Sequence, residues 1–596
     1  MTTPPTDPAL QDALALHRQG KLDLAMQRYV AILQKNPSDA ETLYYVAVLT
    51  VQEGQFPEGL RVIQRALDVS APGPAQAKLH NLMGQTYLRL NQDKDALESF
   101  GRAIASDVTF VDAYGNRGTL LAEMGKSADA LEDFDRALAL RPNNAEDVAN
   151  RAGVLADLGR IDEALMAYSR AIGLNPNFPP NYFNRANVLV KIGQLTDALA
   201  NYDQVIKLAP GMPQAHNNRG LTLKEMGRLE DAKASIEQAL KLNPKFAEAY
   251  SNRASIAFQQ GRYDDAQADY AKALELQPEL AEANHSRGLT YLTQGDWENG
   301  FRLYEYRGKL KQPTFKALPY PRWTGTAEPG EEVVLTTEQG LGDAIQFARF
   351  APEIAKRGVK VTLLAPAPMH RLLSTLEGVT LATPDQAPAV NGHPVRWLPL
   401  MSAPGVLGVK PDNVPGKVPY LAAEPARVEH YAATLGTDGF KIGINWGIGT
   451  VPNWFSRQRD IPLSAFAPLA DIPGVRLISL QKGQALEQLS RCAFRDKIET
   501  IDADMDPNKD MFVDTAALMM NLDLVITCDT SVTHLAGALA RPVFVALPQV
   551  SDWRWLRERE DTPWYPTAKL FRQTKAGDWP GVFARIADAV RAAAKA

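Results

Sequence analysis

Small and large residues recur every 34 positions through the first half of the chain. Glycines form one series (Gly125, Gly159, Gly193, Gly227, Gly261, Gly295), and prolines keep step with it (Pro142, Pro176, Pro210, Pro244, Pro278). Alanines in each period are followed four positions on by a bulky residue, as in Ala130 and Phe134 or Ala164 and Tyr168. This pattern predicts stacked helix pairs in which the small residue lets two helices approach closely. Weaker copies reach back through Gly54 and Gly20, so the array is expected to occupy residues 1–310 in about nine copies.

The spacing resembles the tetratricopeptide repeat, an α-solenoid. A second series, each member followed by arginine, consists of Asn116, Asn150, Asn184, Asn218 and Asn252. The resemblance places these asparagines on the first helix of each pair, facing a concave groove. A row of amides can bond the backbone of an extended protein acceptor. The alternative is that they bond neighbouring helices or water, and the arginines are expected to brace adjacent repeats or to be solvated at the groove rim.

The pattern changes after residue 310, where short apolar runs alternate with helical spacing. Strands are predicted near Val333–Thr336, Val359–Leu364, Arg396–Pro399, Lys441–Trp446, Val475–Gln481, Ile498–Ile501, Leu522–Asp529 and Arg541–Leu547. Alternating strands and helices indicate parallel sheets, hence two Rossmann-like halves, 311–437 and 438–596. The aromatic and proline-rich stretch before the first strand is expected to be a packed connector.

Four motifs carry a second resemblance. They are EQGLGD (338–343), WG (446–447), SLQKG (479–483) and DTSVTHLAGAL (529–539). In this order, and behind a repeat array, they resemble the heptosyltransferase-like domains of GT-B glycosyltransferases. The resemblance implies two Rossmann-like halves in a GT-B arrangement, no metal, and a nucleotide-sugar co-substrate held by the second half.

The candidate donor site begins where Asp529 ends a buried strand. Thr530, Ser531 and the residues after them start a helix, whose free N–H groups and positive dipole end suit phosphate oxygens. His534, on the first turn, could bond a phosphate or ribose hydroxyl. By resemblance this element holds the donor phosphates. The alternative is an ordinary helix cap with His534 packed beneath it.

Further donor contacts are expected after two other strands of the second half. Trp446 and Gly447 follow one strand, and Gln481 and Lys482 end another. Three residues of the loop after Gly447 add polar and cationic groups: Asn453, Arg457 and Arg459. Arginine binds phosphate or a sugar carboxylate in bidentate fashion, and Lys482 would offset leaving-group charge.

The catalytic candidate is Asp343, which follows Gly342 and faces the cleft from the first half. The corresponding aspartate of heptosyltransferases is the candidate base that deprotonates the acceptor hydroxyl. Glu338 is the second candidate. Because aspartate is also a common residue at helix starts, a capping role for Asp343 stays open. A dinucleotide-binding G-x-G-x-x-G motif would have a third glycine where this sequence has Ile345, so a dinucleotide site is not expected.

Composition narrows the class of protein. The net charge is −5 and the chain has two cysteines without zinc-ligand spacing, so neither nucleic-acid binding nor a structural metal is expected. Two D-x-D triplets at 502–506 are expected to be solvated loop. No run reaches the roughly 20 apolar residues of a membrane span, so the expected location is the cytoplasm.

These features predict a protein O-glycosyltransferase whose array holds a protein acceptor. Among repeat-fused relatives the resemblance is greatest to bacterial flagellin glycosyltransferases, which implies a CMP-linked nonulosonic acid such as pseudaminic acid and Ser or Thr of flagellin. Two alternatives remain: an enzyme like the O-linked N-acetylglucosamine transferases that uses a UDP-sugar, and a non-catalytic scaffold with a degenerate nucleotide-sugar site.

Overall fold

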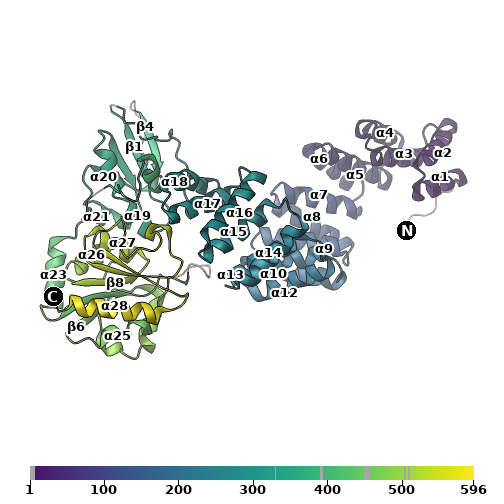
Figure 1. Ribbon diagram of the computed structural model, residues 1–596. Coiled ribbons are helices and arrows are strands. Elements are labelled where there is room, and N and C mark those ends of the chain that lie inside the picture. The colour runs from purple at the N-terminus through teal and green to yellow at the C-terminus, as the bar shows by residue number, and fades with distance from the viewer. Residues whose placement is uncertain are drawn as a thin grey trace. The chain divides into compact units, whose positions relative to one another are not determined.

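The computed structural model describes residues 7–328, 330–388, 394–415, 417–448, 457–501, 505–507 and 510–595. The chain divides into two compact units, Met1–Ala215 and His216–Ala596. The first unit is entirely helical. The second begins inside a helix of the array and contains the remaining repeats together with both parallel sheets (Figure 1).

The array consists of helices that follow one another with short turns (Figure 1). Those of the first unit are α1 (Pro8–Arg18), α2 (Leu22–Lys35), α3 (Ala40–Gln52), α4 (Phe56–Val69), α5 (Pro74–Arg89), α6 (Asp93–Ser106), α7 (Val111–Glu123), α8 (Ser127–Leu140), α9 (Ala145–Asp157), α10 (Ile161–Leu174), α11 (Pro179–Lys191) and α12 (Leu195–Leu208). Then come α13 (Pro213–Glu225), α14 (Leu229–Leu242), α15 (Ala247–Gln259), α16 (Tyr263–Leu276), α17 (Ala281–Gln294) and α18 (Trp297–Tyr304).

The periodic residues explain this architecture. All six glycines of the series have φ between 73° and 89°, a left-handed conformation that ends one helix and turns the chain into the next. The periodic alanines are fully buried, and Phe134 packs where Gly118 of the preceding helix leaves room, 3.1 Å from the position a Cβ atom would take. The large residue therefore fills a gap against the first helix of its own repeat.

The last repeat shares a core with the sheets. Trp297 of α18 is 1% exposed and stacks on Trp564, with ring centroids 5.1 Å apart. Phe301 and Tyr304, also on α18, contact Trp553. A 3₁₀ turn, η1 (Glu305–Lys309), follows α18. The connector after it is packed as predicted, since Trp323 is 1% exposed and its N–H donates to the carbonyl of Trp397 at 2.9 Å.

The first sheet has four parallel strands in the order β3-β2-β1-β4. They are β1 (Glu332–Thr336), β2 (Lys360–Leu364), β3 (Val379–Ala382) and β4 (Val395–Pro399). The helical segments of this region are α19 (Leu341–Phe347), α20 (Phe350–Ala355), α21 (His370–Leu373), α22 (Ala403–Val406) and α23 (Pro425–Leu435). β3 was missed in the sequence because three of its four residues are only half-buried and the fourth is exposed.

The second sheet has six parallel strands in the order β10-β9-β8-β5-β6-β7. They are β5 (Phe440–Asn445), β6 (Val475–Ser479), β7 (Ile498–Thr500), β8 (Leu524–Cys528), β9 (Val543–Leu547) and β10 (Ala568–Arg572). Its helices include α25 (Ala467–Ala470), α26 (Val513–Met519), α27 (Ser531–Ala538) and α28 (Trp579–Ala593), and η8 (Trp553–Trp555) is a 3₁₀ turn. This is the doubly wound Rossmann order, in which ligands bind where the strand order reverses, here between β5 and β8.

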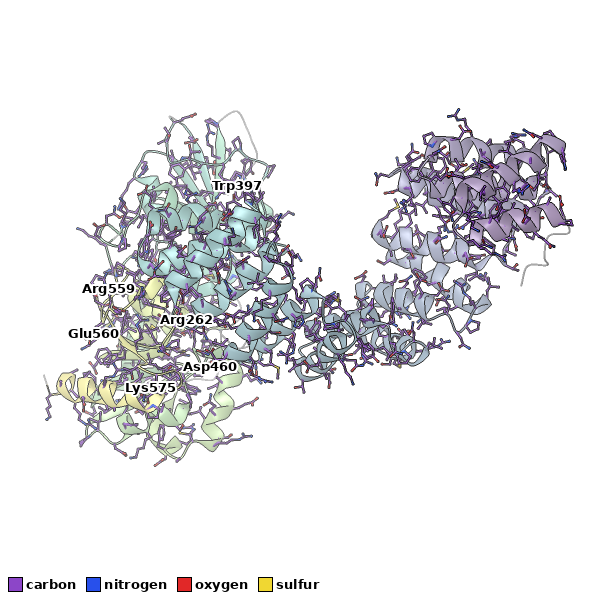
Figure 2. All side chains as sticks on the ribbon, turned by 45° about the vertical axis from the view of Figure 1, so that its right-hand side comes forward. Arg262, Trp397, Asp460, Arg559, Glu560 and Lys575 are labelled. Atoms are coloured by element: carbon purple, nitrogen blue, oxygen red, sulfur yellow. The ribbon has the colours of Figure 1, made fainter. Side chains whose placement is uncertain are left out.

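The sequence thus predicted parallel sheets in both halves correctly, with β10 as a second missed strand. Trp397 of β4 and Lys575, just after β10, mark the first-sheet and second-sheet parts in Figure 2. The GT-B arrangement and the boundary at residue 310 stay predictions. Within the described residues, no helix combines the length and apolar character needed to cross a membrane.

Candidate functional site

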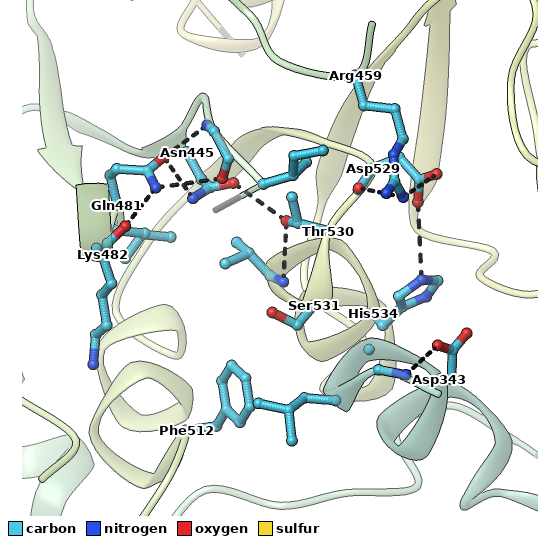
Figure 3. Close-up of a pocket in the computed structure, with 18 of the residues that line it drawn as sticks. Asp343, Asn445, Arg459, Gln481, Lys482, Phe512, Asp529, Thr530, Ser531 and His534 are labelled. Atoms are coloured by element: carbon cyan, nitrogen blue, oxygen red, sulfur yellow. Dashed lines mark hydrogen bonds and ion pairs between the residues drawn. The ribbon is translucent and has the colours of Figure 1, made fainter. Parts of the chain in front are cut away.

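A cavity of about 740 Å³ lies at the carboxyl ends of strands from both sheets (Figure 3). The first sheet contributes the loop after β1, and the second contributes the segments after β5, β6 and β8, together with parts of α26 and η8. The cavity therefore includes the switch point of the second sheet, where the fold itself leaves a crevice.

The N-terminus of α27 opens into this cavity. Thr530 is the N-cap residue, and its Oγ1 accepts a hydrogen bond from the N–H of Val532 at 3.3 Å. Asn445 Oδ1, at the end of β5, accepts from the hydroxyls of Thr527 and Thr530 at 3.1 and 3.2 Å. Ser531 and Val532 line the cavity. A helix start held in this way can bind an anion such as phosphate.

Asp529 and His534 flank this helix start and are both almost buried. Burial, and after it the charge of Asp552, raises the pKa of Asp529 to about 6, against the opposing charge of Arg459. Burial lowers the pKa of His534 well below its usual value, and nearby arginines add to the effect. His534 is therefore neutral, and its ring stacks on Trp555 with centroids 5.7 Å apart.

Asp343 lines the cavity from the opposite sheet, as predicted. Its Oδ2 accepts from the N–H of Gly340 at 2.9 Å, which caps α19, and its Oδ1 accepts from Arg554. Burial raises the pKa of Asp343, while Arg554 and the Gly340 N–H oppose the shift. A carboxylate with a raised pKa is a better proton acceptor, so the capping contact is compatible with the predicted base role, which stays a prediction.

Arg554 is a cavity-lining residue that the sequence reasoning missed. Its guanidinium donates to Asp343, to Asp552 at 2.8 Å and to Gln346 at 2.7 Å, and it stacks on Trp553 at 4.9 Å. This side chain from η8 thus ties the two sheets together at the cavity. The available signal was the triplet Trp-Arg-Trp at 553–555, because an arginine beside aromatic residues favours a cation–π contact, and the rings that Arg554 contacts are Trp553 and Phe347.

Gly342 lies where α19 and α27 approach each other. A Cβ atom there would lie 3.0 Å from His534 Cδ2 and 3.3 Å from the Cα of Ser531. The glycine therefore allows α19 and α27 to meet closely. This contact brings Asp343 and His534 to one cavity.

Trp446 and Gln481, two of the predicted donor contacts, are placed differently by the structure. Trp446 is fully buried and does not line the cavity, because its indole packs under the sheet and donates to the carbonyl of Ala485 at 3.0 Å. Gln481 does line it, but its Oε1 accepts from the N–H groups of Trp446 and Gly447 at 3.0 and 2.8 Å. A Cβ atom on Gly447 would lie 2.4 Å from that of Ala485, so this cavity-lining position requires glycine.

The predicted cations differ in where they lie. Arg459 lines the cavity, 3.5 Å from Asp529, whereas Arg457 does not line it. Lys482 lines the cavity with its ammonium bound to Asp506 at 2.7 Å. Asp506 is therefore held in the structure, contrary to the expected solvated loop, while residues 502–504 and Asn453 lie outside the described residues.

Glu338 does not line the cavity, which contradicts its assignment as the second candidate base. It and Arg307 are both fully buried, and Arg307 Nε and Nη2 donate to its two oxygens at 2.8 Å each. Glu338 thus anchors η1, after the last repeat helix, to the loop following β1. The next residue, Gln339, lines the cavity and donates to the hydroxyl of Tyr304 at 2.7 Å.

The asparagine series is partly engaged within the array. Asn116 donates to Asn81 at 2.9 Å, and Asn252 donates to Asn217 at 2.9 Å. Asn184 is exposed, and Asn150 and Asn218 are half-buried. Arg151 pairs with Asp135 of the preceding repeat, as expected, whereas Arg117 and Arg253 pair with Asp133 and Asp269 within their own repeats. Binding of an acceptor by the asparagines stays a prediction.

No group of three His, Cys, Asp or Glu side chains in the described ranges is placed to hold a metal ion.

Sequence comparisons confirm the predicted repeats. Profiles of the tetratricopeptide repeat match residues 111–144, 219–279 and 254–307, and a TPR repeat profile matches 153–193 and 186–227. Protein FlbA of Caulobacter vibrioides (strain ATCC 19089 / CIP 103742 / CB 15) is 29% identical over 313 residues, 49% of this chain and 52% of that protein. The chain thus spans about half the length of the curated relative it matches.

Solved repeat proteins are similar to part of this chain. One is YrrB, a TPR protein with an unusual peptide-binding site (23% identity, 32% of this chain and 100% of that chain, TM-score 0.28). Another is a tetratricopeptide repeat protein from Parabacteroides merdae ATCC 43184 (20% identity, 42% of this chain and 98% of that chain, TM-score 0.36).

Proposed function

We propose that this protein transfers a sugar from a nucleotide donor to a Ser or Thr hydroxyl of a protein acceptor. The observation that carries the proposal is one cavity lined by a carboxylate, Asp343, from the first sheet and by the N-terminus of α27 from the second. The first group suits an acceptor hydroxyl and the second suits donor phosphates.

In the proposed step, Asp343 takes the proton of the acceptor hydroxyl as its oxygen attacks the anomeric carbon of the sugar. The bond between that carbon and the phosphate oxygen breaks, and its electron pair leaves with the nucleotide. The N–H groups of Ser531 and Val532 and the ring of His534 stabilise the charge that develops on the phosphate. Arg554 holds Asp343 in place, and its positive charge favours the ionised form of the Asp343 carboxylate.

The donor is proposed to be a CMP-linked nonulosonic acid, following the resemblance to flagellin glycosyltransferases. Arg459, which lines the cavity, would then meet the sugar carboxylate or a phosphate. A UDP-sugar is the alternative donor within the same class. The acceptor is proposed to be a protein such as flagellin, held by the repeats, because tetratricopeptide arrays bind extended chains.

A second candidate is a non-catalytic scaffold that binds a nucleotide sugar. One observation favours it: both oxygens of Asp343 already accept hydrogen bonds, one from Gly340 and one from Arg554. In that case the carboxylate only caps α19 and joins the two sheets.

The test incubates the purified full chain with a candidate acceptor and CMP-, UDP-, GDP- or ADP-linked sugars, and measures acceptor mass. We expect a mass increase with one donor, and a rate about 10²–10⁴-fold lower for Asp343→Asn. Asp385→Asn, an exposed aspartate outside the cavity, serves as the matched control. Donor binding without any mass increase, in wild type and variants alike, would establish the scaffold instead.

A further inference from the structure

The neutral ring of His534 carries one proton, and its surroundings decide which nitrogen holds it. His534 Nδ1 lies 3.0 Å from the hydroxyl of Tyr565, and Nε2 lies 4.0 Å from Asp529 Oδ1. One ring face stacks on Trp555, and Cδ2 lies against Gly342. The two nitrogens therefore meet different partners, a hydroxyl and a carboxylate.

We propose that Tyr565 is a positioning residue that holds His534 in the tautomer with its proton on Nε2, the nitrogen that faces Asp529. In this tautomer His534, which lines the cavity, can donate a hydrogen bond from its Nε2–H. That this proton serves a donor phosphate rests on the proposed function, whereas the tautomer itself does not.

Asp529 is the group that Nε2 of His534 faces. When ionised, its carboxylate can only accept hydrogen bonds, so a bare Nε2 lone pair 4.0 Å from it would place two electron-rich atoms face to face. A proton on Nε2 makes this contact attractive. Nδ1 is then an acceptor, and the group within hydrogen-bond distance of it is the Tyr565 hydroxyl.

Tyr565 is well suited to donate. Its side chain is fully buried, and burial raises the pKa of the hydroxyl well above its usual value, so the proton stays on the oxygen. The guanidinium of Arg349 lies 4.9 Å from the Tyr565 ring, and a nearby cation makes a phenol a stronger donor. In the opposite tautomer the proton lies on Nδ1, and Tyr565 would donate to Tyr420 instead of to His534. The Tyr420 hydroxyl itself donates to the carbonyl of Ile345 at 3.0 Å. The Nε2 lone pair would then face Asp529.

The Tyr565 ring packs closely against α27, the helix that carries His534. A Cβ atom on Gly537 of α27 would lie 2.3 Å from the Tyr565 ring, so only glycine lets the ring lie flat on the helix that carries His534. The cations around His534 are Arg554, Arg349 and Arg459, and each favours the neutral imidazole. Tyr565 therefore acts on the position of the proton and leaves the charge of the ring unchanged.

The first measurement is imidazole ¹⁵N NMR of the free full chain labelled at histidine, with the His534 signals assigned by comparison with His534→Ala. We expect the Nε2–H tautomer in wild type and a shift of about fivefold in the tautomer ratio toward Nδ1–H in Tyr565→Phe, the effect of one lost hydrogen bond. Phe keeps the ring on Gly537. Tyr270→Phe, which removes an equally buried hydroxyl on α16, is the control and should leave the His534 signals unchanged. A wild-type Nδ1–H tautomer, or an unchanged ratio in Tyr565→Phe, overturns the proposal.

The second measurement is calorimetric affinity for CMP and UDP. Tyr565→Phe should weaken binding severalfold in wild type but have no further effect in His534→Ala, because the two side chains act through one proton. Equal weakening in both backgrounds would mean that Tyr565 acts only on structure and would overturn its positioning role. If wild type binds neither nucleotide while the NMR result holds, the proposed function fails and the tautomer assignment stands.

Discussion

Glu338→Gln tests whether this glutamate anchors the last repeat or takes part in chemistry. In the structure Glu338 accepts two hydrogen bonds from Arg307 at 2.8 Å, one from the N–H of Met401 at 3.1 Å and one from the hydroxyl of Thr314 at 3.1 Å. Neutralising it leaves the fully buried Arg307 with Glu305, at 3.0 Å, as its remaining carboxylate. Breaking a buried pair costs about 3–5 kcal/mol, and we expect about 3 kcal/mol because Glu305 remains.

Urea unfolding followed by tryptophan fluorescence measures this loss in the second unit alone, because all nine tryptophans lie at position 297 or later. Glu279→Gln is the matched control: Glu279 also pairs with a cation, Lys309, but both side chains are exposed, so the unfolding midpoint should not move. A wild-type midpoint in Glu338→Gln, or a lost transfer rate with unchanged stability, would refute the anchoring role.

Three other perturbations follow from the site. Because the pKa of Asp529 is raised in the folded state, its ionisation lowers the free energy of unfolding as the pH rises from about 4 to about 6. Asp529→Asn should therefore raise the free energy of unfolding at pH 7 by about 3 kcal/mol and leave it unchanged below about pH 4, as measured by denaturation curves in a pH series. Gly342→Ala should cost about 1–3 kcal/mol in the same assay, since its methyl group meets His534, and wild-type stability would contradict the close approach. A fragment of residues 216–596 should bind the donor nucleotide in calorimetry but should not modify the acceptor protein. The shorter fragment 311–596 should have a lower urea unfolding midpoint, because it lacks the α18 side chains of the shared core.

The sequence by itself determined the local elements. The 34-residue period carried the helix pairs and their left-handed glycines, and apolar runs marked eight of the ten strands in the described part of the chain. β3 and β10 were missed, because the half-buried residues of β3 and the single run of β10 near the chain end carry a weak alternation. These features depend on spacing between neighbours along the chain, which the sequence displays directly.

Only the tertiary structure decided which side chains meet. Asp343, Asp529 and His534 were each noted as candidates, and the fold places all three around one cavity. Trp446 and Glu338 stand in equally suggestive motifs, yet one packs under its sheet and the other pairs with Arg307. Arg554, in the 3₁₀ turn η8 between β9 and β10, joins the parts of the chain that carry the two sheets. The reason is physical: a motif specifies a position on a strand end or loop, whereas the direction of a side chain and the identity of its partner depend on elements distant in sequence that pack against it.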